Sequence, residues 1–394
     1  MSTPDIFFIS ATRTAIGTFG GTLKDIPVTD LASLVVKQAL LRAGIEPTRI
    51  GHVVMGNVIP TSPQDIYLSR VAALNAGIPQ ETPAFNVNRL CGSGLQAIVS
   101  AAQVLRLGEA EVVVAGGAES MSRGPYTLAG ARWGNRMGNA QAEDLMLAVL
   151  HDPLQGMHMG VTAENIAERF GISRAEQDEL ALQSQQRASR AIAKGYFTEQ
   201  ISAVPVKTRQ GMVDFDRDEH VRSDVDLDQL QRMKPVFKKD GSVTAGNASG
   251  LNDGASALVM ATADAVRAQG LKPMARLVSY GHSGVAPELM GLGPIPATRQ
   301  ALERAGLKAT DLDVIECNEA FAAQACAVVR ELELDPQRVN PNGSGISLGH
   351  PVGATGAILT TKAIYELQRT HGRYALITLC IGGGQGIAMI IERT

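Results

Sequence analysis

The stretch that decides the fold is QALLRAGIEPTRIGHVV at residues 38–54, because it returns as QALERAGLKATDLDVIE at residues 300–316. Gln, Ala, Leu, Arg, Ala, Gly and Thr recur in place at one constant offset, which indicates duplicated structural units. In the first copy we expect Asp30 to cap a helix that ends at Gly44 and leads into a buried strand. The sequence therefore predicts two related α/β halves.

Both copies continue in the same way. Cys91 opens a small-residue helix after the first copy, and His350 opens a helix after the second. Each helix leads into a run that is apolar on both faces, at 112–115 and at 375–379, as is typical of central strands covered on both sides. We therefore expect Cys91 and His350 at matching helix N-termini.

The chain between the two halves follows a different pattern. From 121 to 250 it is more polar, rich in Gln and Arg, and it lacks the alternation of strands and helices. We predict an N-terminal α/β half over 1–120, completed by 251–272, and a C-terminal α/β half over 273–394. The segment 121–250 is predicted to be an inserted loop domain.

Composition excludes several classes of protein. The 394 residues carry 36 Lys and Arg against 39 Asp and Glu, so a net charge of −3 gives no basic field for nucleic acid. The four cysteines show no CxxC spacing, and the first residues resemble no secretory signal. No run approaches the roughly 18 apolar residues that span a bilayer. We predict a reduced, cytoplasmic protein with no metal site, no nucleic-acid partner and no membrane segment.

Cys91 and His350 are the first candidate site residues. A cysteine at a helix N-terminus lies where free N–H groups and the helix dipole favour a thiolate, which suits a nucleophile; the alternative is a small buried structural residue. His350 precedes a proline suited to the first helical position, and its alternative is a simple helix cap. A pseudo-twofold relation between the halves would bring the two side chains together as nucleophile and base.

Two further candidates stand at predicted strand ends. Cys380 begins CIGGGQG, a turn whose N–H groups suit an oxyanion, and a second thiol there suits proton transfer at a carbon next to a thioester. Asn318 begins NEAF directly after a strand of the second half, where it could hold a water. The alternatives are a structural cysteine and an Asx turn. Cys317 and Cys326 are read as structural.

Four motifs together carry a family resemblance: LCGSG at Cys91, NEAFA at Asn318, GHPVGATG at His350 and CIGGGQG at Cys380. The sequence resembles the thiolases over its whole length. It is most similar to bacterial acetyl-CoA acetyltransferases and the short-chain β-ketothiolases that supply polyhydroxyalkanoate synthesis. The resemblance implies an α/β thiolase fold with two related βαβαβαββ halves in a five-layered α-β-α-β-α arrangement and an inserted loop domain.

The resemblance also implies an acyltransferase mechanism. Cys91, activated by His350, would take an acyl group from one thioester, and Cys380 would remove the α-proton of a bound acetyl-CoA, whose carbanion attacks the acyl-enzyme; thiolysis is the reverse. One oxyanion hole would consist of the His350 ring and a water held by Asn318. The second would consist of the N–H groups of Cys91 and Gly382.

For the substrates, the resemblance points to coenzyme A thioesters: acetyl-CoA, acyl-CoA and 3-ketoacyl-CoA, with no permanently bound cofactor. Arg222 is expected near the adenine, Ser249 near the pantetheine, and His158 and Met159 beside the pantetheine and acyl ends. A homodimer is the minimum expectation. The segment 121–146 corresponds to the region that pairs two dimers in tetrameric thiolases, so a homotetramer is expected.

Three alternatives stay open. A degradative 3-ketoacyl-CoA or β-ketoadipyl-CoA thiolase would use the same chemistry with another acyl pocket, and the flexible Met159 and Met290 set no size limit. A non-catalytic thiolase-fold protein could bind acyl-CoA or lipid, although binding alone requires neither nucleophile nor base. Condensing enzymes that act on carrier proteins commonly pair their cysteine with two histidines, whereas a second thiol stands here.

Overall fold

The computed structural model describes residues 4–394, whose main feature is one large sheet. It has ten strands, of which nine follow the order β14-β15-β16-β13-β1-β12-β5-β3-β4, while β2 pairs with β12. Their bounds are β1 (Ile6–Arg13), β2 (Gly17–Thr18), β3 (His52–Gly56), β4 (Ala84–Val87), β5 (Val112–Ser120), β12 (Asn252–Thr262), β13 (Ala275–Gly284), β14 (Val314–Cys317), β15 (Tyr374–Ile381) and β16 (Gln385–Arg393). The two halves of the sheet meet where β1 pairs with β13 at Phe7–Arg276 and Phe8–Ala275.

The two halves of the sheet have the same topology. In the first, β3 is parallel to β5, and β12 and β1 follow antiparallel; in the second, β14 is parallel to β15, and β16 and β13 follow antiparallel. The first half also has β4 beside β3, whereas the matching place beside β14 holds a single parallel bridge between Ile315 and Val339. The predicted duplication is thus present in the fold.

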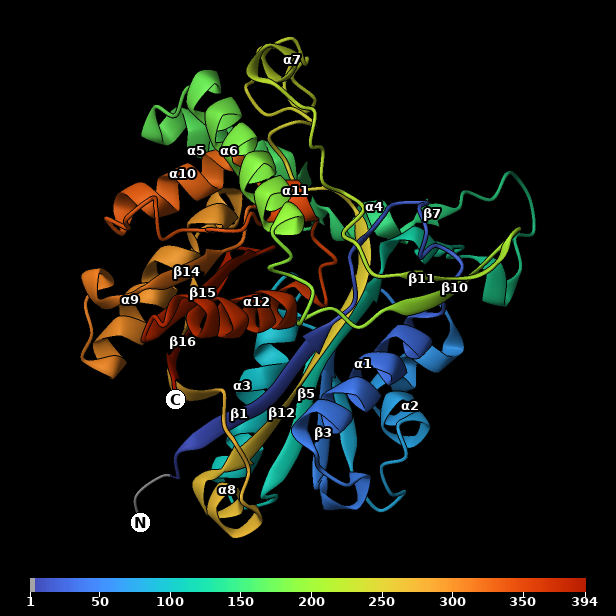
Figure 1. The fold of residues 1–394 in the computed structure, drawn as a ribbon. Helices are drawn as coiled ribbons and strands as arrows, with labels where there is room; N and C mark the ends of the chain where they lie inside the picture. Colours follow the sequence, from blue (N-terminus) through green and yellow to red (C-terminus); the bar gives the residue numbers. More distant parts are fainter. Residues whose placement is uncertain (1–3) are drawn as a thin grey trace.

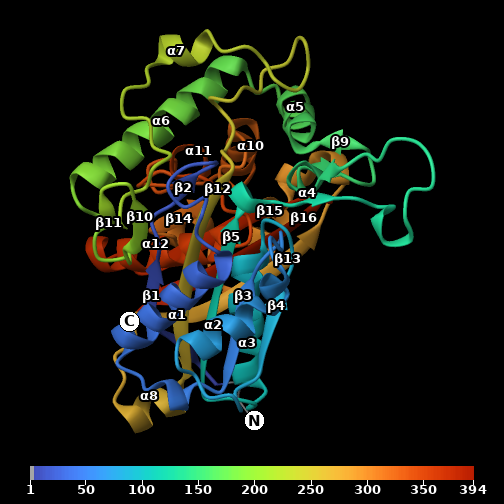
Figure 2. The same cartoon turned by 90° about the vertical axis from the view of Figure 1, so that its right-hand side faces the viewer.

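Helices cover the sheets in alternating layers, as Figures 1 and 2 show. On one side, α1 (Val28–Ala43) and α2 (Leu68–Asn75) lie on the first half-sheet. Next, α3 (Ser93–Arg106) and α12 (Thr355–Thr370) pack against each other between the half-sheets. On the far side, α9 (Pro294–Ala305) covers β13 and β16. This is the five-layered α-β-α-β-α arrangement that the resemblance implied.

The repeat extends well beyond the two quoted stretches. Equivalent residues of the two copies are 262 positions apart, because residue 38 corresponds to residue 300. The same offset separates Gly44 from Gly306, which end α1 and α9 in the left-handed conformation with φ of 62° and 65°. It also relates the strand registers, because Met55 pairs with Gly116 and Cys317 pairs with Thr378. The two halves therefore superimpose residue by residue through their parallel strands.

Two details of the sequence prediction are wrong. The first helix begins at Val28 after Pro27, so Asp30 lies in its first turn, where its charge suits the helix dipole, and does not cap it. Cys91 lies two residues before the start of α3, whereas His350 lies five residues before the start of α12. The helix N-termini match, but the two residues do not occupy equivalent positions in the turns.

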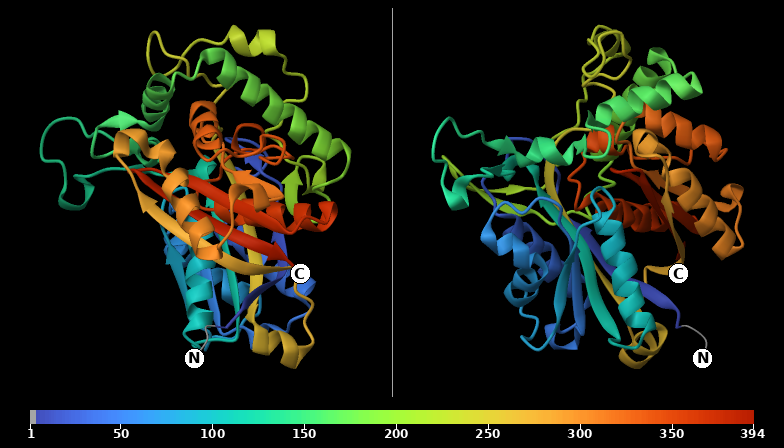
Figure 3. Two further views of the ribbon diagram at one scale, coloured as in Figure 1. Left: turned by 90° about the vertical axis from the view of Figure 1, so that its left-hand side faces the viewer. Right: turned by 180° about the vertical axis from the view of Figure 1, so that it is seen from behind.

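The segment between the halves forms helices and short hairpins (Figure 3), and its residues Val204 and Val206 pack in the core of the first half. In it, α5 and α6 pack against α10 of the C-terminal half, and α6 also packs against α11. The α-helices of the segment are α4 (Leu145–Val149), α5 (Met159–Phe170), α6 (Arg174–Ala193) and α7 (Leu227–Gln231). Its hairpins are β6–β7 (Tyr126–Thr127, Glu143–Asp144), β8–β9 (His151–Asp152, Met157–His158) and β10–β11 (Val204–Thr208, Gly211–Phe215). Outside the segment, the remaining α-helices are α8 (Ala263–Gln269), α10 (Ala322–Glu331) and α11 (Gly345–Leu348). The domain limits given above stay a prediction. Among residues 4–394, no helix combines the length and apolar character needed to cross a membrane.

Glycines let the N-terminal ends of α3 and α12 approach each other in the middle layer. A Cβ on Gly117 of β5 would overlap with the carbonyl oxygen of Gly353, and a Cβ on Gly56 of β3 would lie 2.7 Å from the same oxygen. On the helices, a Cβ on Gly94 would lie 2.8 Å from the backbone nitrogen of Ala357. Because these neighbours are backbone atoms, a side chain has no room to be accommodated.

We expect Gly117→Ala to lower the free energy of unfolding by about 1–3 kcal/mol, since the added methyl group overpacks a rigid backbone contact. Urea denaturation measures the loss. Gly254→Ala on the adjacent strand β12 is the matched control, because its Cβ would meet Pro351, Thr14 and Ile358 at 3.4 Å or more, which is ordinary contact. Equal losses in both variants would contradict the role given to Gly117.

Candidate active site

The turn before α3 presents Cys91. Leu90 adopts a left-handed φ of 47°, and the Ser93 hydroxyl fixes the turn by donating to the Leu90 carbonyl at 2.7 Å and accepting from the Arg89 N–H at 2.8 Å. The Gly382 N–H, in the loop after β15, is near enough to the Cys91 thiol to lower its pKa. The nucleophile candidate of the first half thus lies against the glycine-rich loop of the second half.

The pKa of the Cys91 thiol is higher than expected for a cysteine whose position favours a thiolate. Burial raises the pKa of this thiol to about 11, and the nearby Glu119 raises it further, while the Gly382 and Cys91 N–H groups lower it. The helix itself begins only at Ser93, so the dipole does not outweigh burial. Cys91 is therefore a neutral thiol in the free protein and needs a base to become a nucleophile.

His350 has hydrogen bonds that define its tautomer. The Thr355 hydroxyl donates to the Pro351 carbonyl at 2.9 Å, so its oxygen accepts from Nδ1 of His350 at 2.6 Å. The proton therefore lies on Nδ1, and Nε2 carries a lone pair. Burial lowers the pKa of the His350 ring to about 4, which keeps the ring neutral near pH 7. A neutral imidazole whose Nε2 carries a lone pair is suited to accept a proton.

Asn318 borders the free nitrogen of this ring. Its side chain is fully buried, its backbone N–H donates to the Thr378 carbonyl at 3.0 Å, and its Nδ2 lies 3.4 Å from Nε2 of His350. Its Oδ1 has no hydrogen-bond partner among residues 4–394. A buried carbonyl oxygen without a partner costs free energy, so this position suits a water molecule.

Cys380 lies at the end of β15, one residue before the last of the strand, and is buried in an apolar cluster. Burial raises its pKa well above the ordinary value, and Cys91 and Cys317 add to the shift, which places the two candidate thiols near each other. The apolar cluster around Cys380 also contains Met159 and Met290, together with Ala163, Val243, Ala320 and Phe321. Both methionines predicted for an acyl pocket therefore line the surroundings of Cys380.

Gly382 lies close to both Met159 and Leu90. A Cβ there would come within 3.1 Å of Met159 Cε and 3.2 Å of Leu90 Cδ1, so a side chain would crowd the cluster. The next residues, Gly383 and Gly384, have φ of 78° and 80°, which glycine alone adopts at low cost. The loop thus turns sharply directly after β15.

Three of the four candidate coenzyme A residues lie beside this cluster. His158 caps α5 by accepting the Gly160 N–H at 3.0 Å, and its ring stacks on Phe237 with a centroid distance of 4.6 Å. Met159 is the first residue of α5 and packs with Cys380. Ser249 donates its N–H to the Ala320 carbonyl at 2.9 Å, directly beside NEAF.

Arg222 lies apart from the other candidates, on an exposed cleft of about 370 Å³. Leu251 lines this cleft and also packs in the apolar cluster that includes Cys91, so the cleft leads toward the thiol. The segment is anchored at Asp218, which forms a fully buried ion pair with Arg13 of β1 at 2.7 Å. A ligand that reaches from Arg222 to Cys91 would therefore run along a firmly held surface.

Sequence reasoning missed three residues that hold the site together. Thr355 fixes the tautomer of His350, and Asn252 accepts the backbone N–H of His350 at 2.9 Å. Glu119 is buried and accepts N–H groups from Asn57, Val58, Ile59 and Gly353, although burial raises its pKa to about 8. Thr355 occurs in the GHPVGATG motif, but nothing in the sequence around Thr355, Asn252 or Glu119 indicates what these side chains contact.

Comparison with known proteins agrees with this geometry. Residues 6–264 match the family model described as thiolase, N-terminal domain, and residues 271–393 match thiolase, C-terminal domain. The chain is 62% identical over 392 residues to beta-ketothiolase BktB of Cupriavidus necator, covering 99% of this chain and 100% of that protein. It is 46% identical to acetyl-CoA acetyltransferase of Pseudomonas aeruginosa, covering 99% of both chains.

A solved structure extends the likeness to three dimensions. The crystal structure of human mitochondrial 3-ketoacyl-CoA thiolase in complex with CoA matches with a TM-score of 0.97 and 47% identity, covering 100% of this chain and 98% of that chain. Two family domains in order, full-length relatives and a common fold lead to one conclusion. The chain belongs to the thiolase family and has the thiolase fold.

Proposed function

We propose that this thiolase is a β-ketothiolase of the acetyl-CoA acetyltransferase type. It condenses acetyl-CoA reversibly with a short acyl-CoA and cleaves 3-ketoacyl-CoA with free CoA. The observation that carries the proposal is the proximity of two thiols, Cys91 and Cys380, in a protein whose buried His350 is neutral and turns its Nε2 to Asn318. The 62% identity to beta-ketothiolase BktB supports the β-ketothiolase assignment.

Acylation begins with three neutral groups. His350 takes the proton of Cys91 on Nε2 as Sγ attacks the thioester carbonyl. The C–S bond to coenzyme A then breaks, and Cys380 gives its proton to the departing sulfur. The N–H groups of Gly382 and Cys91 stabilise the acyl oxygen. The products are an acyl-Cys91, a Cys380 thiolate and a protonated His350, so charge is conserved.

Condensation uses the charges that acylation created. The Cys380 thiolate removes an α-proton from a second thioester, acetyl-CoA. The enolate oxygen accepts hydrogen bonds from Nε2–H of His350 and from a water held by Asn318, whose Oδ1 is otherwise unpaired. The enolate carbon attacks the acyl carbon and releases the Cys91 sulfur. The proton on His350 then returns to Cys91, and thiolysis follows the same steps in reverse.

For coenzyme A, we propose that Arg222 contacts the adenine, Ser249 the pantetheine, and His158 and Met159 the pantetheine and acyl ends. The cleft beside Arg222 and its continuity with the cluster at Cys91 through Leu251 support this order. The homotetramer and the cytoplasmic location stay predictions from the sequence, and size-exclusion chromatography with light scattering tests the first.

We expect purified protein to remove the enolate absorbance of acetoacetyl-CoA only when free CoA is added. The cleavage of 3-ketoacyl-CoAs of increasing length then reports the acyl pocket. Faster cleavage of the shortest substrates is expected, whereas a preference for long or adipyl chains would favour the degradative alternative. Failure to cleave any of them, by protein shown to be folded, would refute the proposed activity.

Cys380→Ser should still become acylated at Cys91, although more slowly, because coenzyme A can leave as a thiolate without the proton of Cys380. It should exchange the α-protons of acetyl-CoA at least a hundredfold more slowly, because it lacks the proton-transfer group. Mass spectrometry measures acylation, and deuterium uptake from D₂O measures exchange. Cys91→Ala is the contrasting variant and should not be acylated at all. Normal exchange in the Cys380→Ser protein would remove Cys380 from the mechanism.

The acylation step should be almost independent of pH between 7.5 and 5.5. Since burial lowers the pKa of His350 to about 4, the ring stays unprotonated and able to act as a base over this range. A histidine with the ordinary pKa of about 6.5 would be roughly nine-tenths protonated at pH 5.5 and lose about tenfold in rate. Rapid-quench acylation measures the rate, and circular dichroism verifies the fold at each pH.

A further inference from the structure

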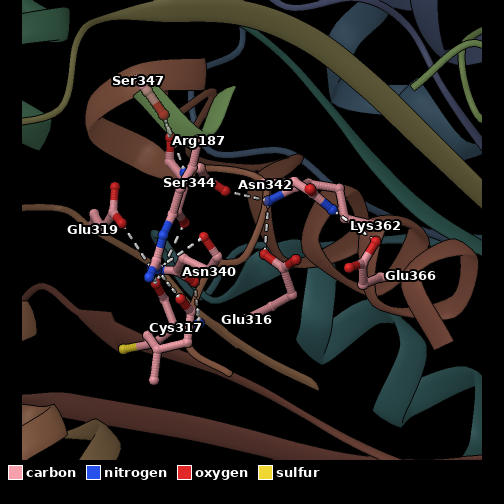
Figure 4. Close-up of polar contacts among 12 residues, drawn as sticks. Arg187, Glu316, Cys317, Glu319, Asn340, Asn342, Ser344, Ser347, Lys362 and Glu366 are labelled. Carbon is pink, nitrogen blue, oxygen red and sulfur yellow. Dashed lines mark hydrogen bonds and ion pairs between the residues drawn. The ribbon is translucent and has the colours of Figure 1, made fainter. Parts of the chain in front are cut away.

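Glu319 is a fully enclosed carboxylate that the mechanism above does not use. It directly follows Asn318 and is 3% exposed. Its oxygens accept hydrogen bonds from Asn340 Nδ2 at 2.8 Å and from the Ser184 hydroxyl at 2.6 Å. Figure 4 shows Glu319 and Asn340 within a cluster of polar contacts. An acidic side chain is rarely buried without a purpose, because its desolvation is costly.

The partner of Glu319 holds the backbone that carries Asn318. Asn340 accepts the Cys317 N–H at 2.9 Å and donates to the Cys317 carbonyl at 2.8 Å, so one side-chain amide grips both polar groups of the residue before Asn318. Asn340 itself has a left-handed φ of 47°, which asparagine tolerates better than most residues.

Helix α6 of the inserted segment supplies the rest of the cluster. Arg187 is buried and donates to the carbonyls of Val339, at 2.5 Å, and Pro336, at 3.0 Å, on the loop that leads to Asn340. Ser184, one turn earlier, reaches Glu319. The cluster therefore ties the loop with Asn340 and the NEAF segment to the same face of α6.

We propose that Glu319 is a positioning residue for Asn318: it orients the Asn340 amide, which fixes the Cys317 backbone and thereby the Asn318 side chain against Nε2 of His350. The inference rests on the proposed function, in which Asn318 stabilises the enolate. Asn318 takes no part in the proposed acylation step. Loss of Glu319 therefore affects the two stages of the reaction differently, whereas general loosening of the fold affects both.

The test compares Glu319→Gln with Asn318→Ala and with the double variant. We expect Glu319→Gln to slow deuterium uptake by acetyl-CoA roughly ten- to a hundredfold, since a small misplacement of a catalytic group is costly, and to change the rate of Cys91 acylation less than twofold. In the double variant the second substitution should add little. Glu366→Gln is the matched control, because Glu366 is a buried carboxylate that binds Asn342 at 2.7 Å, on the same loop.

The outcomes separate the two proposals. If Asn318→Ala exchanges protons normally, the role of Asn318 in the proposed function is wrong. If Asn318→Ala is slow but Glu319→Gln is not, the positioning role alone is wrong. Equal slowing of acylation and exchange in Glu319→Gln would also overturn the positioning role. So would an equally large slowing of exchange in Glu366→Gln. Either result would indicate a general structural defect and no specific positioning of Asn318.

Discussion

The close approach of the N-terminal ends of α3 and α12 is the constraint on which the site depends. The carbonyl of Gly353 is wedged against Gly56 and Gly117 at the ends of two parallel strands, where no side chain fits. Since protein interiors transmit such contacts rigidly, the turn before α12 can lie in only one place relative to the first half. That contact brings His350, which precedes the turn, to the same side of the sheets as Cys91.

Burial decides the electrostatics of the site. It raises the pKa values of both thiols and lowers that of His350, so the free protein holds these groups neutral. Charges are costly in such surroundings unless they form as pairs. In the proposed mechanism acylation creates the imidazolium and the Cys380 thiolate together, and the second step consumes both. The reactive thiolate then exists only while an acyl group is present to be attacked.

The two halves, their layers and the four candidate site motifs could be recognised in the sequence, because a duplication and short glycine-rich motifs are local patterns. The sequence did not predict the contacts between motifs. Asn340 lies 22 residues after Asn318, and nothing in its neighbourhood in the sequence indicates that it grips Cys317. The expected thiolate at Cys91 was wrong for the same reason, since desolvation depends on residues from both halves that only the fold brings together.

The duplication also explains how one symmetric scaffold carries an asymmetric site. At the offset of 262, Asn318 corresponds to Gly56 and Cys380 corresponds to Ala118. In the first half these positions are small, and Gly56 must be small because the Gly353 turn packs on it. In the second half the equivalent strand ends are free to carry an amide and a thiol. The first half thus has small residues where the close contact requires them, and the second half carries the proposed water-holding amide and proton-transfer thiol.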